Sequence, residues 1–180
     1  GSAFLPIGES LCDAVNPQRQ SQRIRCVATP TAGSIYNINA VNNGRLQLGL
    51  VQEDQVVDHL AGSNGGEYHD LRLVAVMHLS PVSVIVRRSA NVEQLAQIKG
   101  LRINMGSRGS GQFTVSAGLI QALGLTEADF PVVRHEPTDA FEKIFCGGTV
   151  DLVVEVVPHP VAVIEKLLAC GGRFLEIPPD

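Results

Sequence analysis

The chain of 180 residues contains no tryptophan, and aromatic residues make up only 4% of it. Its core must therefore be aliphatic, and abundant Val, Ile, Leu and Ala are typical of parallel strands that are covered on both faces. The sequence also lacks an apolar run of the ~18 residues that a membrane-spanning helix needs. No basic segment followed by an apolar one stands near Gly1, so the sequence by itself neither indicates nor excludes export.

The chain has no run of Lys or Arg, and its formal net charge is -4 with a pI near 5.7. It therefore has no electrostatic footprint for a phosphate backbone or an anionic membrane, and we expect no nucleic-acid partner. A hydrophobic fraction of 44%, a charged fraction of 18% and a mean hydropathy of +0.14 exclude a disordered or collagen-like chain. These values predict a folded protein of one domain or two small ones.

Short β-branched segments alternate with helical patterns along the chain. The strand-like segments are residues 24–28, 48–51, 71–77, 83–86, 102–104 and 152–157. The helical patterns are residues 7–15, 34–42, 92–98, 112–123, 138–145 and 161–169. This alternation predicts an α/β fold with mainly parallel sheets flanked by helices, whose ligands lie at the carboxyl ends of the strands. The polar, glycine-rich residues 62–67 predict a surface loop.

Three strand-to-helix junctions share one design. The first is Thr29 to Ser34, with Ser34 as the expected N-cap, and the second is the glycine-rich segment Gly106 to Gly111. A weaker third junction is Val157 to Pro160, where Pro160 suits a first helical turn. Glycines let the backbone approach a ligand, and the unpaired N–H groups at a helix start favour an anion. The junctions therefore predict a site for a carboxylate or phosphate group.

Neither cofactor nor metal motifs support a more specific site. Residues 106–111 are not a phosphate-binding P-loop, because no Lys follows at the required spacing, and their glycines are out of register for a dinucleotide fingerprint. The four cysteines form no CxxC pair and have no His placed for zinc. They fall into two local pairs, Cys12 with Cys26 and Cys146 with Cys170, separated by 14 and 24 positions. Two disulfides and four reduced, buried cysteines are both compatible with this spacing.

Several segments, in order, resemble one protein family. They are A-G-S-I-Y-N-I-N-A-V within residues 29–41, Asn43 to Leu46, Leu50 to Gln52, Leu71-Arg72, His78, Pro81, Arg87, residues 101–106 with 109–111, residues 122–124, residues 148–151 and His159-Pro160. In this pattern the chain resembles the solute-binding proteins of TRAP transporters, TAXI family. The resemblance covers almost the whole chain.

The resemblance implies a type II periplasmic-binding-protein fold with two lobes, residues 1–78 and 79–180, that close on a small organic acid or amino acid such as glutamate. It implies an extracytoplasmic receptor without catalysis or cofactor, which hands its ligand to membrane transporter subunits. Family members carry cysteines near the four positions found here, which favours two disulfides and an oxidising compartment. The residues expected to line the cleft are Ser34, Tyr36, Gln52, Glu53, Ser107, Arg108, Ser110, Gly111 and Gln112.

Three residues depart from the family pattern. Glu53 stands where Ser is usual and Glu155 where an aromatic or small polar residue is expected; an acid facing the cleft would repel a second carboxylate and attract an amine. Arg108 replaces a common Pro and offers a fork for a carboxylate. His78 and His159 match family positions, and for histidines at strand ends a structural role is the more frequent one.

The resemblance also implies that the family extends beyond both ends of this sequence, so that the first lobe is incomplete here. An unpaired sheet edge would favour a homodimer. A sensor domain of a membrane-bound signalling receptor, with a signalling module as partner, is a second hypothesis. A third is an enzyme with Cys146 as nucleophile, which is disfavoured because Cys146 is expected at a helix C-terminus, where the dipole raises the pKa of a thiol.

Overall fold

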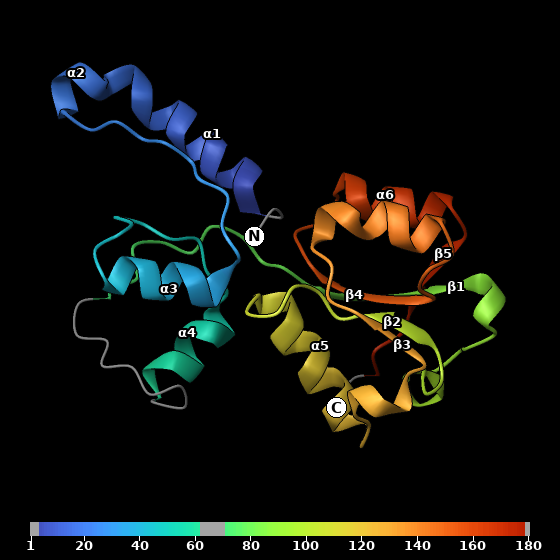
Figure 1. Cartoon of the computed structure of the whole chain (residues 1–180). Helices are drawn as coiled ribbons and strands as arrows, with labels where there is room; N and C mark the ends of the chain where they lie inside the picture. The colour runs from blue at the N-terminus through green and yellow to red at the C-terminus, as the bar shows by residue number, and fades with distance from the viewer. Residues whose placement is uncertain (1–3, 62–70, 179–180) are drawn as a thin grey trace. The chain divides into compact units, whose positions relative to one another are not determined.

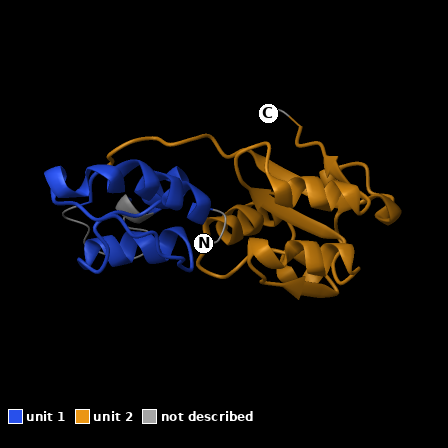
Figure 2. Ribbon diagram, turned by 90° about the horizontal axis from the view of Figure 1, so that it is seen from above, with its two compact units in different colours: residues 1–72 blue, residues 73–180 orange. Residues whose placement is uncertain are grey.

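The computed structural model describes residues 4–61 and 71–178, and the chain divides into two compact units (Figures 1 and 2). Unit 1 comprises residues 1–72 and unit 2 comprises residues 73–180. The predicted loop at 62–67 lies outside the described residues. Among the described helices, none has the length and apolar character that crossing a membrane requires.

Unit 1 is helical in its described part. Its elements are α1 (Leu5–Val15), the 3-10 helix η2 (Asn16–Gln18), α2 (Arg19–Gln22), α3 (Ser34–Asn42) and α4 (Glu53–Leu60). The strands predicted at 24–28 and 48–51 are wrong, because these segments are extended but have no ladder partner among the described residues. The segment 71–77 is likewise outside any strand. A β-rich composition favours an extended backbone, whereas a strand also requires a neighbouring chain.

In unit 1, side-chain hydrogen bonds and a disulfide hold the segments 24–28 and 48–51 in place of a β-ladder. The Asn16 carboxamide makes two hydrogen bonds with Cys26: Oδ1 accepts from the backbone N–H at 2.9 Å and Nδ2 donates to the carbonyl at 3.1 Å. A disulfide joins Cys12 to Cys26. The Asn37 amide donates to the Leu50 carbonyl at 2.8 Å. Two extended segments are thus held against helices by amides and one covalent bond.

Unit 2 is built on a five-stranded sheet in the order β3-β2-β4-β1-β5. Its strands are β1 (Val82–Arg87), β2 (Arg102–Asn104), β3 (Val132–Arg134), β4 (Leu152–Val156) and β5 (Gly172–Leu175). Its longer helices are α5 (Gly111–Ala122) and α6 (Ala162–Ala169), and its short ones are η3 (Arg88–Ala90), η4 (Leu95–Gln97), η5 (Glu127–Asp129), η6 (Thr138–Ala140) and the π-helix η7 (Glu142–Cys146). The strands predicted at 83–86, 102–104 and 152–157 are confirmed.

The sheet is mixed rather than mainly parallel. Strand β2 runs parallel to β3 and β4, whereas β1 runs antiparallel to both β4 and β5. The prediction of mainly parallel sheets is therefore only half right for this unit. The prediction rested on the apolar composition of strands that are buried on both faces. Such strands have the same composition whether they run parallel or antiparallel to their neighbours.

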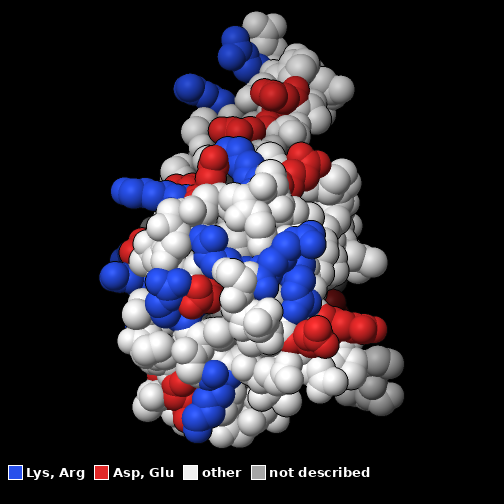
Figure 3. Space-filling view, turned by 90° about the vertical axis from the view of Figure 1, so that its right-hand side faces the viewer, with Lys and Arg blue, Asp and Glu red and all other residues white. Residues whose placement is uncertain are grey.

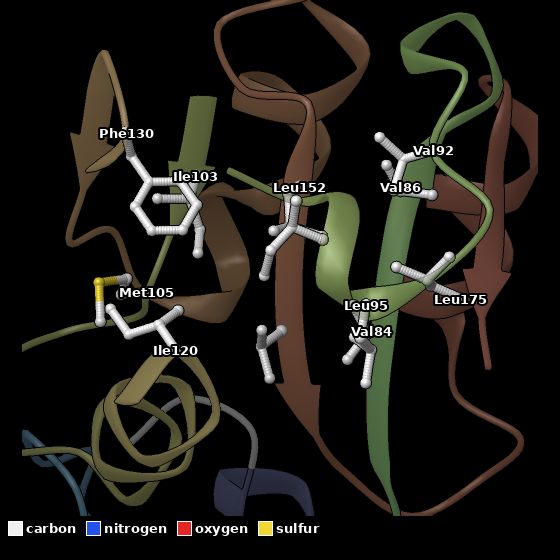
Figure 4. Packing of buried hydrophobic residues seen from close by; sticks show 12 residues of the cluster. Val84, Val86, Val92, Leu95, Ile103, Met105, Ile120, Phe130, Leu152 and Leu175 are labelled. Atoms are coloured by element: carbon white, nitrogen blue, oxygen red, sulfur yellow. The ribbon is translucent and has the colours of Figure 1, made fainter. Parts of the chain in front are cut away.

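Helices cover both faces of this sheet (Figure 1). On the α5 side, a cluster of buried hydrophobic residues from four strands, α5 and η4 includes Val84, Ile103, Leu152 and the aromatic Phe130 (Figure 4). Because successive side chains of a strand point to opposite faces, Ile85 faces the α6 side. A Cβ at Gly172 would lie 2.6 Å from the Leu167 carbonyl oxygen, so glycine permits this close approach of α6.

The helical predictions at 7–15, 34–42, 112–123 and 161–169 are confirmed to within two residues at each end. The helix predicted at 92–98 is reduced to the single turn η4, where the Gln97 side chain accepts from the N–H groups of Glu93 and Gln94 at 2.8 and 3.1 Å. The helix predicted at 138–145 is divided into η6 and the π-helix η7. The disulfide between Cys146 and Cys170 joins η7 to the residue after α6.

An ion pair joins Arg102, the first residue of β2, to Asp151, the residue before β4. The Arg102 guanidinium donates to both oxygens of Asp151, at 2.8 Å from Nε and 2.5 Å from Nη2, and Nη1 donates to the Gly148 carbonyl at 2.6 Å. Hydrogen bonding from Arg102 holds the pKa of the Asp151 carboxyl below its usual range. On the face seen in Figure 3, basic and acidic side chains lie close together at several places. A second ion pair of unit 2 joins Lys99 to Asp129 at 2.8 Å.

Candidate functional site

The predicted site residues fall into two groups, one in each unit. Unit 1 contains Ser34, Tyr36, Gln52 and Glu53, and unit 2 contains Ser107, Arg108, Ser110, Gly111 and Gln112. The unit 2 group lies at the start of α5, and the unit 1 group lies at the starts of α3 and α4.

In unit 2 the group lies on the loop that joins β2 to α5. After β2, the Met105 N–H still donates to the carbonyl of Arg134, the last residue of β3, at 2.9 Å. The chain then turns at Gly106 and Gly109, whose φ angles of +82° and +81° are strained for other residues. The loop therefore starts at the carboxyl ends of two parallel strands, which is the position predicted for the ligand-binding loops.

Ser110 is the N-cap of α5. Its hydroxyl oxygen accepts from the Phe113 N–H at 3.1 Å and donates to the Ser107 carbonyl at 2.6 Å. The amides of Gly111 and Gln112 belong to the first turn, where a helix offers no internal acceptor. No acidic residue stands in this first turn, so its partial positive charge is not neutralised within the helix. This arrangement suits an anionic group.

Gln112 has a structural task. It is buried, and its Nε2 donates to the Val154 carbonyl of β4 at 2.5 Å. A Cβ at Gly106 would lie 2.6 Å from its Cδ, so Gly106 gives Gln112 its space. The side chain thus fixes the start of α5 against the sheet.

Arg108 is the exposed member of the loop, and its side chain is 63% exposed. Its Nη2 lies 3.4 Å from both carboxylate oxygens of Glu127 and 3.0 Å from Nε2 of His135. The guanidinium carbon lies 5.3 Å from the ring centroid of Phe113, in the first turn of α5. Arg108 is therefore held beside the capped helix start by an acid, an imidazole and an aromatic face.

Glu155 lies near the carboxyl end of β4, and it is 1% exposed. Its Oε1 accepts from the Val156 N–H at 3.0 Å, and its Oε2 accepts no hydrogen bond from any described residue. Burial raises the pKa of this carboxyl to about 7, against the smaller opposite effects of the Val156 N–H and the Thr138 hydroxyl. Glu155 is thus a buried acid rather than an exposed one.

Across the ladder, Ser83 of β1 lies directly opposite Glu155. Its hydroxyl is 2.9 Å from Nε2 of His159, which follows β4. The His159 ring lies 6.0 Å from that of Phe174. These contacts assign His159 a hydrogen-bonding role within the unit, the kind of role expected of a histidine at a strand end.

In unit 1 the group lies where α3 and α4 begin. Gly33 rather than Ser34 is the N-cap of α3, which corrects the sequence-based assignment. Gly33 has a φ of +126°, and Ser34 becomes the first helical residue. The buried Ser34 hydroxyl instead accepts from the Gln52 N–H at 3.1 Å, immediately before α4. This bond joins the two helix starts.

Tyr36 and Glu53 are the exposed residues of this group. The Tyr36 side chain is 47% exposed in the first turn of α3. Glu53 is the first residue of α4, and with Asp54 it places two carboxylates in that first turn. Because these carboxylates already neutralise the start of α4, the unit 1 group is less suited to an anion than the loop of unit 2.

Several contributors to the site were not predicted from the sequence. Asn104 at the end of β2 makes two hydrogen bonds with the backbone of Glu136, through Oδ1 at 2.9 Å and Nδ2 at 3.2 Å. This pairing holds the loop after β3, which carries His135, next to the loop after β2. The available signal was an Asn at the end of a short buried strand, a position from which a side-chain amide can pair with a neighbouring backbone.

Solved structures with similar folds are binding proteins. The aliphatic sulphonate binding protein SsuA of Escherichia coli matches with a TM-score of 0.58 at 17% identity, over 94% of this chain and 53% of that one. SsuA of Xanthomonas axonopodis pv. citri, bound to MOPS, matches with a TM-score of 0.60 at 16% identity, over 94% and 56%. An ancestral arginine-binding protein bound to arginine matches with a TM-score of 0.57 at 12% identity, over 91% and 66%.

The chain spans about half the length of the two sulfonate-binding proteins. At these identities the likeness concerns the fold, and it confirms the predicted α/β binding-protein architecture. A family model described as NMT1-like matches residues 1–177, which is nearly the whole sequence. The chain belongs to the NMT1-like family.

Proposed function

We propose that the protein is an extracytoplasmic solute-binding protein that binds the acid group of a small organic acid or amino acid. The observation that carries this proposal is the loop 105–112 of unit 2, with its capped and uncharged helix start beside the exposed Arg108. Helix amides and an arginine together suit a carboxylate or a sulfonate. The similar structures are two sulfonate-binding proteins and an arginine-binding protein, which supports the same class of ligand.

Binding, rather than catalysis, is the proposed activity. Cys146 is disulfide-bonded to Cys170, so its thiol is unavailable as a nucleophile in this structure. The two disulfides support a periplasmic or other oxidising compartment, since such bonds are rare in the cytosol. We further propose that residues 1–78 and 79–180 act as lobes, and that a ligand shifts them from an open to a closed state. Ser34, Tyr36, Gln52 and Glu53 then supply the unit 1 contacts.

For the partner we propose a membrane transporter. The motif resemblance to TAXI-type solute-binding proteins supports a TRAP transporter and a glutamate-like ligand, while the NMT1-like family and the similar structures support the broader class of solute-binding proteins. The sensor role and the homodimer stay predictions from the sequence. Sedimentation of the purified protein tests the dimer, which predicts twice the mass of 19.2 kDa.

A thermal-shift screen tests the proposal. The panel contains glutamate, glutarate, 2-oxoglutarate, ethanesulfonate, taurine and arginine, because a ligand at 100 times its dissociation constant adds ~2.7 kcal/mol to the free energy of unfolding. We expect at least one acid to raise the melting temperature. The Arg108→Ala variant should bind that acid ~10- to 100-fold more weakly, equivalent to ~1.5–3 kcal/mol. Equal affinities would remove Arg108 from the site, and no shift with any acid would contradict the proposed function.

A further inference from the structure

Arg108 already has an acidic partner, and the geometry of that contact is poor. A carboxylate bound by an arginine fork receives two parallel hydrogen bonds from two nitrogens, usually at 2.7–2.9 Å. Here a single nitrogen, Nη2, faces both oxygens of Glu127 at 3.4 Å. The two side chains are 63% and 39% exposed, and exposed pairs of this kind contribute little. The contact is therefore easily replaced.

Two further neighbours, His135 and Phe113, contact the guanidinium besides Glu127. Nη2 lies 3.0 Å from Nε2 of His135, and the group sits over the ring of Phe113. Phe113 and His135 are themselves in contact, with ring centroids 5.6 Å apart. The imidazole and the phenyl ring thus contact Arg108 in addition to the carboxylate, and Nε2 of His135 itself lies 3.5 Å from Oε2 of Glu127.

We propose that Glu127 is an internal competitor for Arg108, which an acidic ligand must displace. This inference rests on the proposed function, because it concerns the same anion site. The ligand acid takes the guanidinium with two hydrogen bonds instead of one weak contact, and it also reaches the amides of Gly111 and Gln112. Glu127 thereby sets how tightly the site binds acids, and it keeps Arg108 paired when the site is empty.

The competition predicts that removal of the Glu127 charge tightens binding. Titration calorimetry at low ionic strength, with L-glutamate and ethanesulfonate as probes, compares the wild-type protein, Glu127→Gln, Arg108→Ala and the double variant. We expect Glu127→Gln to lower the dissociation constant about two- to fivefold, as the loss of an exposed ion pair allows. In the Arg108→Ala background the same substitution should change nothing, since the contested group is gone.

Glu142→Gln is the matched control. Glu142 also forms an exposed ion pair in unit 2, with Lys166 at 2.6 Å, and its substitution changes the net charge by the same amount. It lies on η7, away from the loop, and we expect its affinity for both probes to equal that of the wild-type protein. Thermal unfolding without ligand should give melting temperatures for both Gln variants that agree with the wild-type value, which verifies that they fold.

Three outcomes contradict the inference. If Glu127→Gln and the wild-type protein bind equally while Arg108→Ala binds weakly, Glu127 does not compete, although the proposed function stands. If Glu142→Gln tightens binding as much as Glu127→Gln, the effect is one of net charge. If none of the proteins binds either probe, this inference fails for carboxylates and sulfonates; the wider screen then decides whether the proposed function fails with it.

Discussion

The two units stabilise extended segments by different means. In unit 2 the strands lie in a sheet, and residues such as Ile85, Val86 and Ile103 are fully buried between covering helices. In unit 1 the extended segments have no ladder among the described residues, and Val27 and Leu48 are 68% and 72% exposed. The comparison teaches that the same β-branched composition yields a strand only where neighbouring chains supply hydrogen bonds on the correct side.

This difference explains which strands and helices could be predicted correctly from the sequence. Strands at 83–86, 102–104 and 152–157 follow from apolar segments of the right length, and helix α5 follows from its pattern and its glycine-rich start. The same signals at 24–28 and 48–51 gave wrong strands, since composition does not report a missing partner. The antiparallel direction of β1 could not be predicted from the sequence, because buried strands have the same composition in parallel and antiparallel sheets.

The candidate site was partly predictable for a similar reason. The loop 105–112 is one continuous segment of the sequence. Its glycines predict a turn, its serines predict a helix cap, and its arginine predicts an anionic ligand. Glu127, His135 and Asn104 act across sequence distances that only the folded unit defines. The assignment of Ser34 as a cap failed because Gly33, with φ at +126°, occupies that position and leaves the Ser34 hydroxyl to Gln52.

The largest expected difference between the units concerns the disulfides. Either pair of Cys→Ala changes, at Cys12 and Cys26 or at Cys146 and Cys170, removes a bond across a short loop and should cost about 3 kcal/mol. Loss of the first bond should lower hydrogen-exchange protection in α1 and in residues 24–28, because the two Asn16 hydrogen bonds then hold this segment without the covalent bond. Loss of the second should leave β1 and β4 protected. Equal loss of protection in both units would contradict the comparison.

The buried acid of unit 2 predicts that the stability of the protein depends on pH. The folded pKa of Glu155 is about 7, above its ordinary 4.5. Between these values the folded protein keeps a proton that the unfolded chain has lost, so the free energy of unfolding decreases as pH rises from about 4.5 to about 7. Glu155→Gln should remove this decrease and be more stable than the wild-type protein by up to about 3 kcal/mol at pH 8.

Urea denaturation at pH 4.5 and pH 8 measures this effect. At pH 4.5 the variant and the wild-type protein should differ by only about 0.4 kcal/mol, because Glu155 is protonated in the folded state and half protonated in the unfolded one. Glu53→Gln is a suitable control, since Glu53 is an exposed acid of unit 1. An equal pH dependence in Glu155→Gln and the wild-type protein would show that Glu155 is not the titrating group.

The smallest difference concerns the two asparagines that pair with backbone. Asn104 is fully buried, and its replacement by Ala leaves the Glu136 backbone groups without their partners, at a cost of about 2 kcal/mol. Asn16 is partly exposed, so water can replace its bonds to Cys26 and Asn16→Ala should cost only about 1 kcal/mol. Thermal unfolding compares the two variants. A larger loss for Asn16→Ala would reverse the proposed order.

Amide chemical-shift mapping of the whole chain by NMR tests the central claim most directly. On titration with the acid that stabilises the protein most, the account predicts the largest shifts at the backbone N–H groups of Gly109, Gly111 and Gln112, together with the Arg108 side-chain N–H. Shifts that spare this loop and gather elsewhere would contradict the assignment of the anion site to the start of α5.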